Sequence, residues 1–136
     1  MGNHEPTTIT KRTLTEGLPQ PAGPYSHVAT IGDLVITAGF GPQDPVTGEI
    51  PESVAAQTDA VLRNVAAALG AVGADLDDVL KATVHLADVH RDFAEFNAAY
   101  ATHFEAPYPV RTTVGSVLPG ILVEIDVVAR RGGAAR

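Results

Sequence analysis

The stretch of residues 107–129, PYPVRTTVGSVLPGILVEIDVVA, constrains the fold more than any other part of the chain. Its run of β-branched residues predicts two strands, over residues 110–115 and 121–129. Successive side chains of a strand point to opposite faces of the sheet. Each strand carries one charged residue, Arg111 or Glu124, that this apolar pattern does not explain.

Two interpretations of Arg111 and Glu124 stay open on these residues alone. We expect the two side chains on the same side of neighbouring strands, where they can form the floor of a binding site for a small acid, with a polarised water nearby. The same placement also fits an ordinary cross-strand ion pair, which contributes about 0.2–1 kcal/mol to stability. The rest of the chain has to decide between them.

Length and charge exclude several classes of protein. The 136 residues suffice for a single domain, over residues 1–136, with residues 1–6 as a flexible tail. A net charge of −7 without any basic run argues against a nucleic-acid partner. The longest apolar segments fall short of the ~20 residues that a membrane span needs. Because the chain has no cysteine and its N-terminus lacks the apolar core of a signal peptide, we expect a cytoplasmic protein without disulfides.

The first third of the chain predicts three strands and a rigid loop. The strands are expected over residues 9–14, 25–30 and 34–38, and the last two form a hairpin. Residues 16–24 contain three prolines and two glycines, which favours a fixed, irregular loop. Such loops often carry functional side chains, and Tyr25 follows this one directly.

Two later segments have the apolar period of amphipathic helices. The first begins at Pro51 or Ser53 and runs to about Gly70; the second covers roughly residues 91–104, with Asp88 as its cap. The residues expected on the buried stripes are Val54, Val61, Leu62, Val65, Leu69 and Val72, then Phe93, Phe96, Tyr100 and Phe104. Between the helices lies a predicted strand whose core-facing residues are Leu80, Ala82, Val84 and Leu86.

The predicted order is therefore strand, strand, strand, helix, strand, helix, strand, strand. Two helices with one apolar stripe each can cover only one face of a sheet, which indicates an α+β fold. The other face must then meet solvent or another subunit. The residues expected on that other face are Thr83, His85, Arg111, Thr113, Leu122, Glu124 and Val128.

Eight short segments, in register from about Ile9 to Arg130, carry a resemblance to a known family. They are Gly23-Pro24-Tyr25-Ser26, Thr37-Ala38-Gly39, the run DPVTGE at 44–49, Gln57 with Asn64, Asn97 with Tyr100, Pro109-Val110-Arg111, Leu118-Pro119 and Val123-Glu124-Ile125-Asp126. On these residues the chain resembles the RidA/YjgF family of reactive-intermediate deaminases, which hydrolyse imines and enamines.

The resemblance implies a chorismate-mutase-like α+β fold, with a mixed sheet, that forms a homotrimer with ligand sites between subunits. It implies that Arg111 clamps the substrate carboxylate and that Glu124 holds the attacking water. The reaction is the hydrolysis of a small 2-imino or 2-enamino acid to the 2-keto acid and ammonia. Such hydrolysis needs positioning, a polarised water and proton handling, so we expect no cofactor. We also expect no metal site, because the five histidines lack metal-ligand spacing.

Two departures from the family pattern leave an alternative function open, and a third change, at Thr113, is a common one. Ala38-Gly39-Phe40 replaces the usual Ser-Gly-Gln, the connection around Leu118-Pro119 is shorter, and Thr113 stands where a cysteine is frequent. The more apolar pocket favours a bulkier substrate, or a non-catalytic trimeric binder of small carboxylates with a regulatory or stress role. Ribonuclease activity, attributed to some relatives, is disfavoured by the acidic charge. The residues expected to line the substrate pocket are Tyr25, Gly39, Phe40, Asn97 and Thr113.

Overall fold

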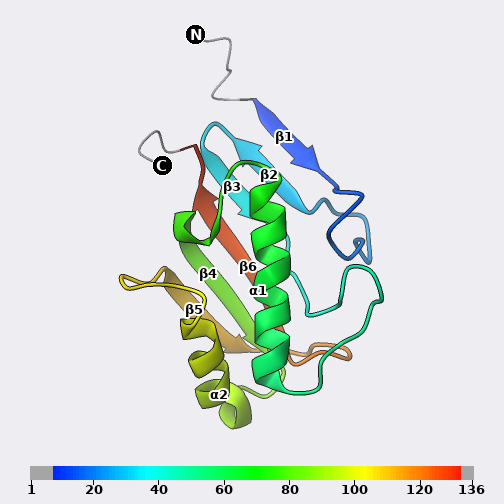
Figure 1. Cartoon of the computed structure of the whole chain (residues 1–136), viewed down its shortest axis with the longest axis vertical. Helices are drawn as coiled ribbons and strands as arrows, with labels where there is room; N and C mark the ends of the chain where they lie inside the picture. The colour runs from blue at the N-terminus through cyan, green and yellow to red at the C-terminus, as the bar shows by residue number, and fades with distance from the viewer. Residues whose placement is uncertain (1–7, 133–136) are drawn as a thin grey trace.

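Two helices cover one face of a six-stranded sheet (Figure 1). The computed structural model describes residues 8–132, so the tail expected over residues 1–6 lies outside the described residues. The strands are β1 (Ile9–Arg12), β2 (Val28–Ile31), β3 (Leu34–Thr37), β4 (Val79–Leu86), β5 (Val110–Gly115) and β6 (Val123–Arg130), and the helices are α1 (Val54–Gly70) and α2 (Val89–Ala101), with a 3₁₀ turn, η1 (Leu76–Asp78), before β4. This order of strands and helices confirms the predicted one. None of the helices within residues 8–132 combines the length and hydropathy that crossing a membrane requires.

Both helices begin directly after caps that the sequence predicts, although α2 begins and ends two to three residues earlier than the expected residues 91–104. The Ser53 hydroxyl accepts a hydrogen bond from the N–H of Ala56, and the Asp88 carboxylate accepts one from the N–H of Arg91. These caps matter because the first turn of a helix leaves its N–H groups without partners inside the helix. The whole predicted stripe of α1 is buried against the sheet.

The buried stripe of α2 differs from the prediction at one position. The helix buries Asp92, Phe96 and Tyr100, which are four residues apart, so Phe93 lies at the margin of the stripe and is 44% exposed. The Asp92 carboxylate accepts two hydrogen bonds from the Arg91 guanidinium, both at 2.9 Å. These bonds lower the pKa of Asp92, so an ionised carboxylate can occupy a buried position on the stripe.

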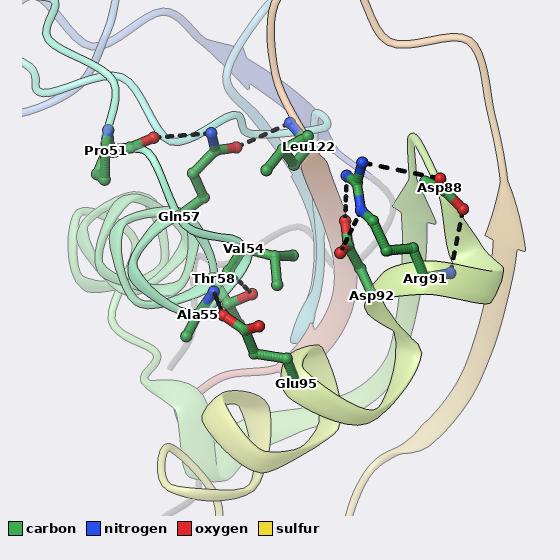
Figure 2. A network of polar contacts seen from close by, with 10 residues as sticks. All are labelled: Pro51, Val54, Ala55, Gln57, Thr58, Asp88, Arg91, Asp92, Glu95 and Leu122. Carbon is green, nitrogen blue, oxygen red and sulfur yellow. Dashed lines mark hydrogen bonds and ion pairs between the residues drawn. The ribbon is translucent and has the colours of Figure 1, made fainter.

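Gln57 joins α1 to two loops (Figure 2). Its Nε2 donates to the carbonyl of Pro51, and its Oε1 accepts from the N–H of Leu122, both at 2.8 Å. The Glu95 carboxylate of α2 accepts from the N–H of Ala55, which links the two helices at the same end. Gln57 is buried, so these bonds are shielded from water and hold the β5–β6 connection against α1.

One residue of β4 faces away from the core, against the prediction. The register between β4 and β6 shifts between Val79 and Lys81, which marks a β-bulge at Leu80. An extra residue in a bulge interrupts the alternation of side chains. Leu80 is therefore 53% exposed, whereas Val79 is buried with the core residues of the strand.

The strand order corrects the most specific expectation from the sequence. Across the sheet the order is β1-β2-β3-β6-β4-β5, so β4 separates β5 from β6. The prediction that Arg111 and Glu124 lie on neighbouring strands is wrong. Two parallel strands joined by a helix lie side by side, which puts β5 next to β4, and β6 then pairs with the other edge of β4.

The register also places Arg111 and Glu124 on opposite faces of the sheet. Arg111 is opposite Ala82, a residue buried under the helices. Glu124 is opposite His85, which lies half-buried on the uncovered face. Thr113 shares the face of Arg111, so the assignment of Arg111 and Thr113 to the uncovered face is wrong. The assignments of His85 and Glu124 to that face are right.

We call this second face, without helices, the open face. It exposes large apolar side chains: Ile36 is 46% exposed, Val110 67% and Val114 39%. They lie on two strands, Ile36 on β3 and the two valines on β5, and polar residues such as Glu124 lie between them. An apolar strip of this kind is typical of a surface that another chain covers.

Candidate functional site

Strand β5 places Arg111 directly beneath helix α2. The guanidinium carbon lies over three aromatic rings of that helix, 4.8 Å from the ring centre of Tyr100, 5.3 Å from that of Phe96 and 5.9 Å from that of Phe93. Its Nη2 donates a hydrogen bond to Oδ1 of Asn97 at 2.7 Å. Because rings on one helix and an amide from the same helix contact the side chain, the direction of its fork is fixed.

The guanidinium opens into a hollow of about 350 Å³, which we call the arginine hollow. Within residues 8–132, no carboxylate forms an ion pair with Arg111. A cation that is oriented but not neutralised can bind a planar anion through two parallel hydrogen bonds. The residues lining the arginine hollow are Asn97, Tyr100, Ala101, Tyr108, Pro109 and Arg111.

Two hydroxyl groups near the arginine hollow have no partner within residues 8–132. The Tyr100 hydroxyl and the Thr113 Oγ1 are both buried and make no hydrogen bond. Burial raises the pKa of Tyr100, although the charge of Arg111 acts in the opposite direction. Thr113 does not line the arginine hollow, so its predicted contact with a substrate remains a prediction.

A second region, on the open face, surrounds Glu124. Two adjoining hollows, of about 620 and 260 Å³, share Tyr25, Gly39 and Glu124 in their walls. We call them together the glutamate hollow. A Cβ atom on Gly39 would lie only 2.6 Å from Oε2 of Glu124. The absence of a side chain at position 39 is therefore what leaves space for the carboxylate.

Tyr25 stands at the end of the proline-rich loop and is 48% exposed. Its hydroxyl oxygen accepts a hydrogen bond from the N–H of Ala22 at 3.0 Å. Because an N–H can only donate, the hydroxyl hydrogen of Tyr25 remains available to a ligand. The ring also lies over Gly23, so the loop itself sets its direction.

Phe40 contributes to the wall of the glutamate hollow from a buried position. Its side chain is 4% exposed, and its backbone exchanges two hydrogen bonds with Ile125, the residue after Glu124. Its ring stacks on that of His27, with 5.8 Å between ring centres. The sequence predicts Phe40 at the pocket and favours a purely structural role for His27, whose place in the wall only packing and hydrogen bonds reveal.

All of the predicted site residues except Thr113 fall into one of two groups. Arg111 and Asn97 are brought together in the arginine hollow, and Tyr25, Gly39, Phe40 and Glu124 are brought together in the glutamate hollow. A single chain does not bring the two groups together, because they lie on opposite faces of the sheet. The aromatic residues that contact Arg111 recur with a helical period on α2. The sequence pattern assigned these residues to a buried stripe and did not indicate that they contact Arg111. Within residues 8–132, no cluster of three or more His, Asp or Glu residues is arranged to hold a metal ion.

The fold and these hollows define an α+β protein with an oriented guanidinium in one hollow and a carboxylate in another. The chain belongs to the RidA/YjgF/L-PSP family, because a family profile described as "Endoribonuclease L-PSP" matches residues 15–131.

Named relatives and solved structures agree with this membership. The chain is 38% identical over 128 residues to the 2-iminobutanoate/2-iminopropanoate deaminase of Escherichia coli, covering 90% of this chain and 99% of that protein. It is 44% identical over 119 residues to a RutC family protein of Pyrococcus horikoshii, covering 85% and 94%. The structure of Escherichia coli TdcF with bound serine is 36% identical, with a TM-score of 0.83 over 90% of this chain and all of that one. RidA from an Antarctic Psychrobacter species is 33% identical, with a TM-score of 0.83 over 89% and 99% of the two chains.

Proposed function

We propose that the protein is a hydrolytic deaminase of small 2-imino and 2-enamino acids, acting at sites that assemble between copies of the chain. The observation that carries the proposal is the oriented but unneutralised guanidinium of Arg111 in an open hollow. The deaminase named among the relatives supports the reaction type, and the serine bound to TdcF supports a small carboxylate as ligand.

In this proposal, Arg111 binds the substrate carboxylate. Asn97 occupies one N–H of the guanidinium, which leaves others for the two carboxylate oxygens. The rings of Phe93 and Tyr108, both partly exposed near this cation, provide apolar surface for the rest of the substrate. A two-point contact fixes the orientation of the imine carbon, which is where positioning accelerates the reaction.

Glu124 acts as the base in the proposed chemical step. It accepts a proton from a water, whose oxygen attacks the imine carbon while the π electrons of the C=N bond move to nitrogen. Glu124 passes this proton to the nitrogen, which gives a neutral carbinolamine. As the carbinolamine collapses, Glu124 takes the hydroxyl proton, the C=O bond forms, the C–N bond breaks, and the nitrogen receives that second proton and leaves as ammonia. One imino acid and one water give one keto acid and one ammonia, without oxidation and without a cofactor. The Tyr25 hydroxyl is the nearby donor for the polar intermediate.

In this proposal, a second copy of the chain brings a glutamate hollow close to the arginine hollow of the first. The arginine hollow adjoins β5, the edge strand of the sheet, and the glutamate hollow lies on the open face. An edge laid against the open face of another copy brings Arg111 of one chain to Glu124 of the next. Repeating this contact in a closed ring gives the expected homotrimer, and it covers the exposed apolar strip.

The test is the hydrolysis of 2-iminopropanoate generated in the cuvette, with larger imines derived from leucine and phenylalanine beside it. We expect a rate well above spontaneous hydrolysis, together with protection of Arg111 by small carboxylates. Wild-type protein that leaves the spontaneous rate unchanged contradicts the proposal. Carboxylate binding without any acceleration would instead establish the alternative, a non-catalytic binder, which Ala38 and Phe40 motivate.

Nucleic-acid binding and cellular location stay predictions. The family description names an endoribonuclease, but a net charge of −7 disfavours contact with a phosphate backbone. RNA binding that persists at physiological salt would overturn this expectation. The cytoplasmic location also stays a prediction.

A further inference from the structure

We propose that His27 is a positioning residue of the glutamate hollow: its neutral ring, protonated on Nε2, holds the Tyr25 loop in register with the wall that carries Glu124. The consequence for catalysis rests on the proposed function. The structural part of the proposal stands without it.

Hydrogen bonds from both ring nitrogens fix the tautomer of His27. Nδ1 lies 2.9 Å from the backbone nitrogen of Leu14, which can only donate, so Nδ1 must accept. Nε2 lies 2.8 Å from the carbonyl oxygen of Pro19, which can only accept, so Nε2 must carry the proton. The side chain is 1% exposed, so water cannot replace either partner.

These two partners stand at the start of the proline-rich loop. Leu14 precedes it and Pro19 lies within it, and the same loop ends at Tyr25. A single imidazole thus joins two points of a segment that has no strand or helix of its own. The loop can vary little in position as long as both bonds persist.

The other side of His27 contacts the wall of Glu124. The His27 carbonyl accepts a hydrogen bond from the N–H of Ala38 at 2.9 Å, and its ring stacks on Phe40. Gly39, between Ala38 and Phe40, is the residue at which an added Cβ would lie 2.6 Å from Oε2 of Glu124. His27 therefore contacts both segments that define the glutamate hollow, without being needed as a proton donor or acceptor in the reaction.

Two kinds of variant separate the hydrogen bonds of the His27 ring from its packing against Phe40. Glutamine offers one acceptor and one donor on a neutral side chain, so His27→Gln can keep both bonds. Phenylalanine keeps the stacking on Phe40 but leaves the Leu14 N–H and the Pro19 carbonyl without partners. His27→Phe and His27→Gln therefore form a matched pair. His27→Asn is a second variant, whose shorter side chain cannot reach both partners. His90→Gln, at an exposed position on α2, controls for substitution as such.

Kinetics test the catalytic consequence. We expect His27→Phe to lower kcat about tenfold or more with KM within about twofold, since Glu124 moves while the carboxylate site of Arg111 does not. His27→Gln should stay within about threefold of the wild type in kcat, as should His90→Gln. An unchanged kcat in folded His27→Phe, or a loss in His27→Gln as large as in His27→Phe, overturns the positioning role.

Two spectroscopic measurements do not depend on activity. Imidazole ¹⁵N shifts of the wild type should show His27 as the neutral Nε2–H form; an Nδ1–H or charged ring overturns the proposal. In protein labelled with 3-fluorotyrosine, the ¹⁹F resonance of Tyr25 should shift in His27→Phe or His27→Asn and return in His27→Gln. If the wild type proves inactive, the proposed function fails, whereas these measurements still decide the role of His27. If His27→Phe does not fold, the ¹⁵N shifts and the other two variants decide it.

Discussion

The two faces of the sheet hold the two charged groups of the candidate site in different ways. On the helix-covered face, three aromatic rings and the Asn97 amide fix the Arg111 guanidinium. On the open face, the Glu124 carboxylate has no hydrogen bond or ion pair within residues 8–132, and the backbone of Gly39 packs closely against it. The comparison shows that one chain orients its own guanidinium. The hydrogen-bond partners of its carboxylate have to come from a ligand, a water or another copy of the chain.

The largest expected effect comes from removing the oriented cation. Arg111→Ala should lower kcat/KM roughly 100-fold or more, because a charged contact to the substrate carboxylate disappears. Arg111→Lys keeps the charge without the fork and should show a smaller but clear loss. Steady-state kinetics, with size-exclusion chromatography to verify the assembly, measure both. An Arg111→Ala variant with wild-type kcat/KM would show that the helix-covered face plays no part in catalysis.

The second prediction tests whether the two faces meet between copies. Arg111→Ala and Glu124→Gln chains should each be nearly inactive, but equal amounts unfolded and refolded together should regain activity. Each site takes one group from each of two chains, so random assembly leaves roughly a quarter of the sites intact. Mixing Arg111→Ala with the double variant is the matched control and should restore nothing. If the first mixture stays as inactive as its components, sites between copies are refuted.

A smaller effect is expected where the backbone limits Glu124. In Gly39→Ala, the new methyl group would lie 2.6 Å from Oε2 of Glu124, so the carboxylate must move. We expect kcat to fall about tenfold, with little change in KM. Gly70→Ala is the control, since nothing lies within 4 Å of a Cβ at that position. Equal kcat values for the two variants would show that the position of Glu124 is not critical.

The smallest expected effect is on stability, and it differs between one carboxylate on the open face and one on helix α2. Burial raises the pKa of Asp126 on the open face, whereas hydrogen bonds from Arg91 lower that of Asp92 on α2. The ionised form of Asp126 therefore opposes folding, and its cost grows as the pH rises from the ordinary value of 3.8 through the raised one. The ionised form of Asp92 favours folding above that ordinary value, and this contribution is lost as the pH falls through the lowered one.

Thermal unfolding of two variants measures this difference. At pH 7, Asp126→Asn should raise Tm and Asp92→Asn should lower it. Both differences should shrink in acid, where the wild-type carboxyl groups are protonated as well. A shift of the same sign in both variants would contradict the opposite pKa directions of the two groups.

Much of the fold could be predicted because its signals are local. Ser53 and Asp88 identify the helix starts, and the alternation around Glu124 identifies its strand and the face of that strand. What failed depends on distant partners. Nothing within residues 107–129 reveals that β4 lies between the two strands, because β4 comes from a segment that precedes α2. The bulge at Leu80 is likewise a property of the pairing with β6 rather than of the strand alone.

In the candidate site, too, local features could be predicted from the sequence and features that depend on distant partners could not. Arg111 and Glu124 could be singled out because a charge in an apolar strand is unusual, and the family resemblance gave them roles. Their separation onto opposite faces could not be foreseen, since it follows from the register of β4 with β5 and β6. His27 was hidden for another reason: its partners are backbone groups of Leu14 and Pro19, which carry no mark in the side-chain pattern.

The position of the arginine hollow beside an edge strand has a consequence for how such a protein responds to its own concentration. In the proposed site no isolated chain holds a complete catalytic centre, so dilution that separates the copies abolishes turnover while each chain stays folded. Specific activity then rises with protein concentration and levels off once assembly is complete. Cellular abundance would act on this protein as an effector does, without a regulatory pocket or a covalent modification.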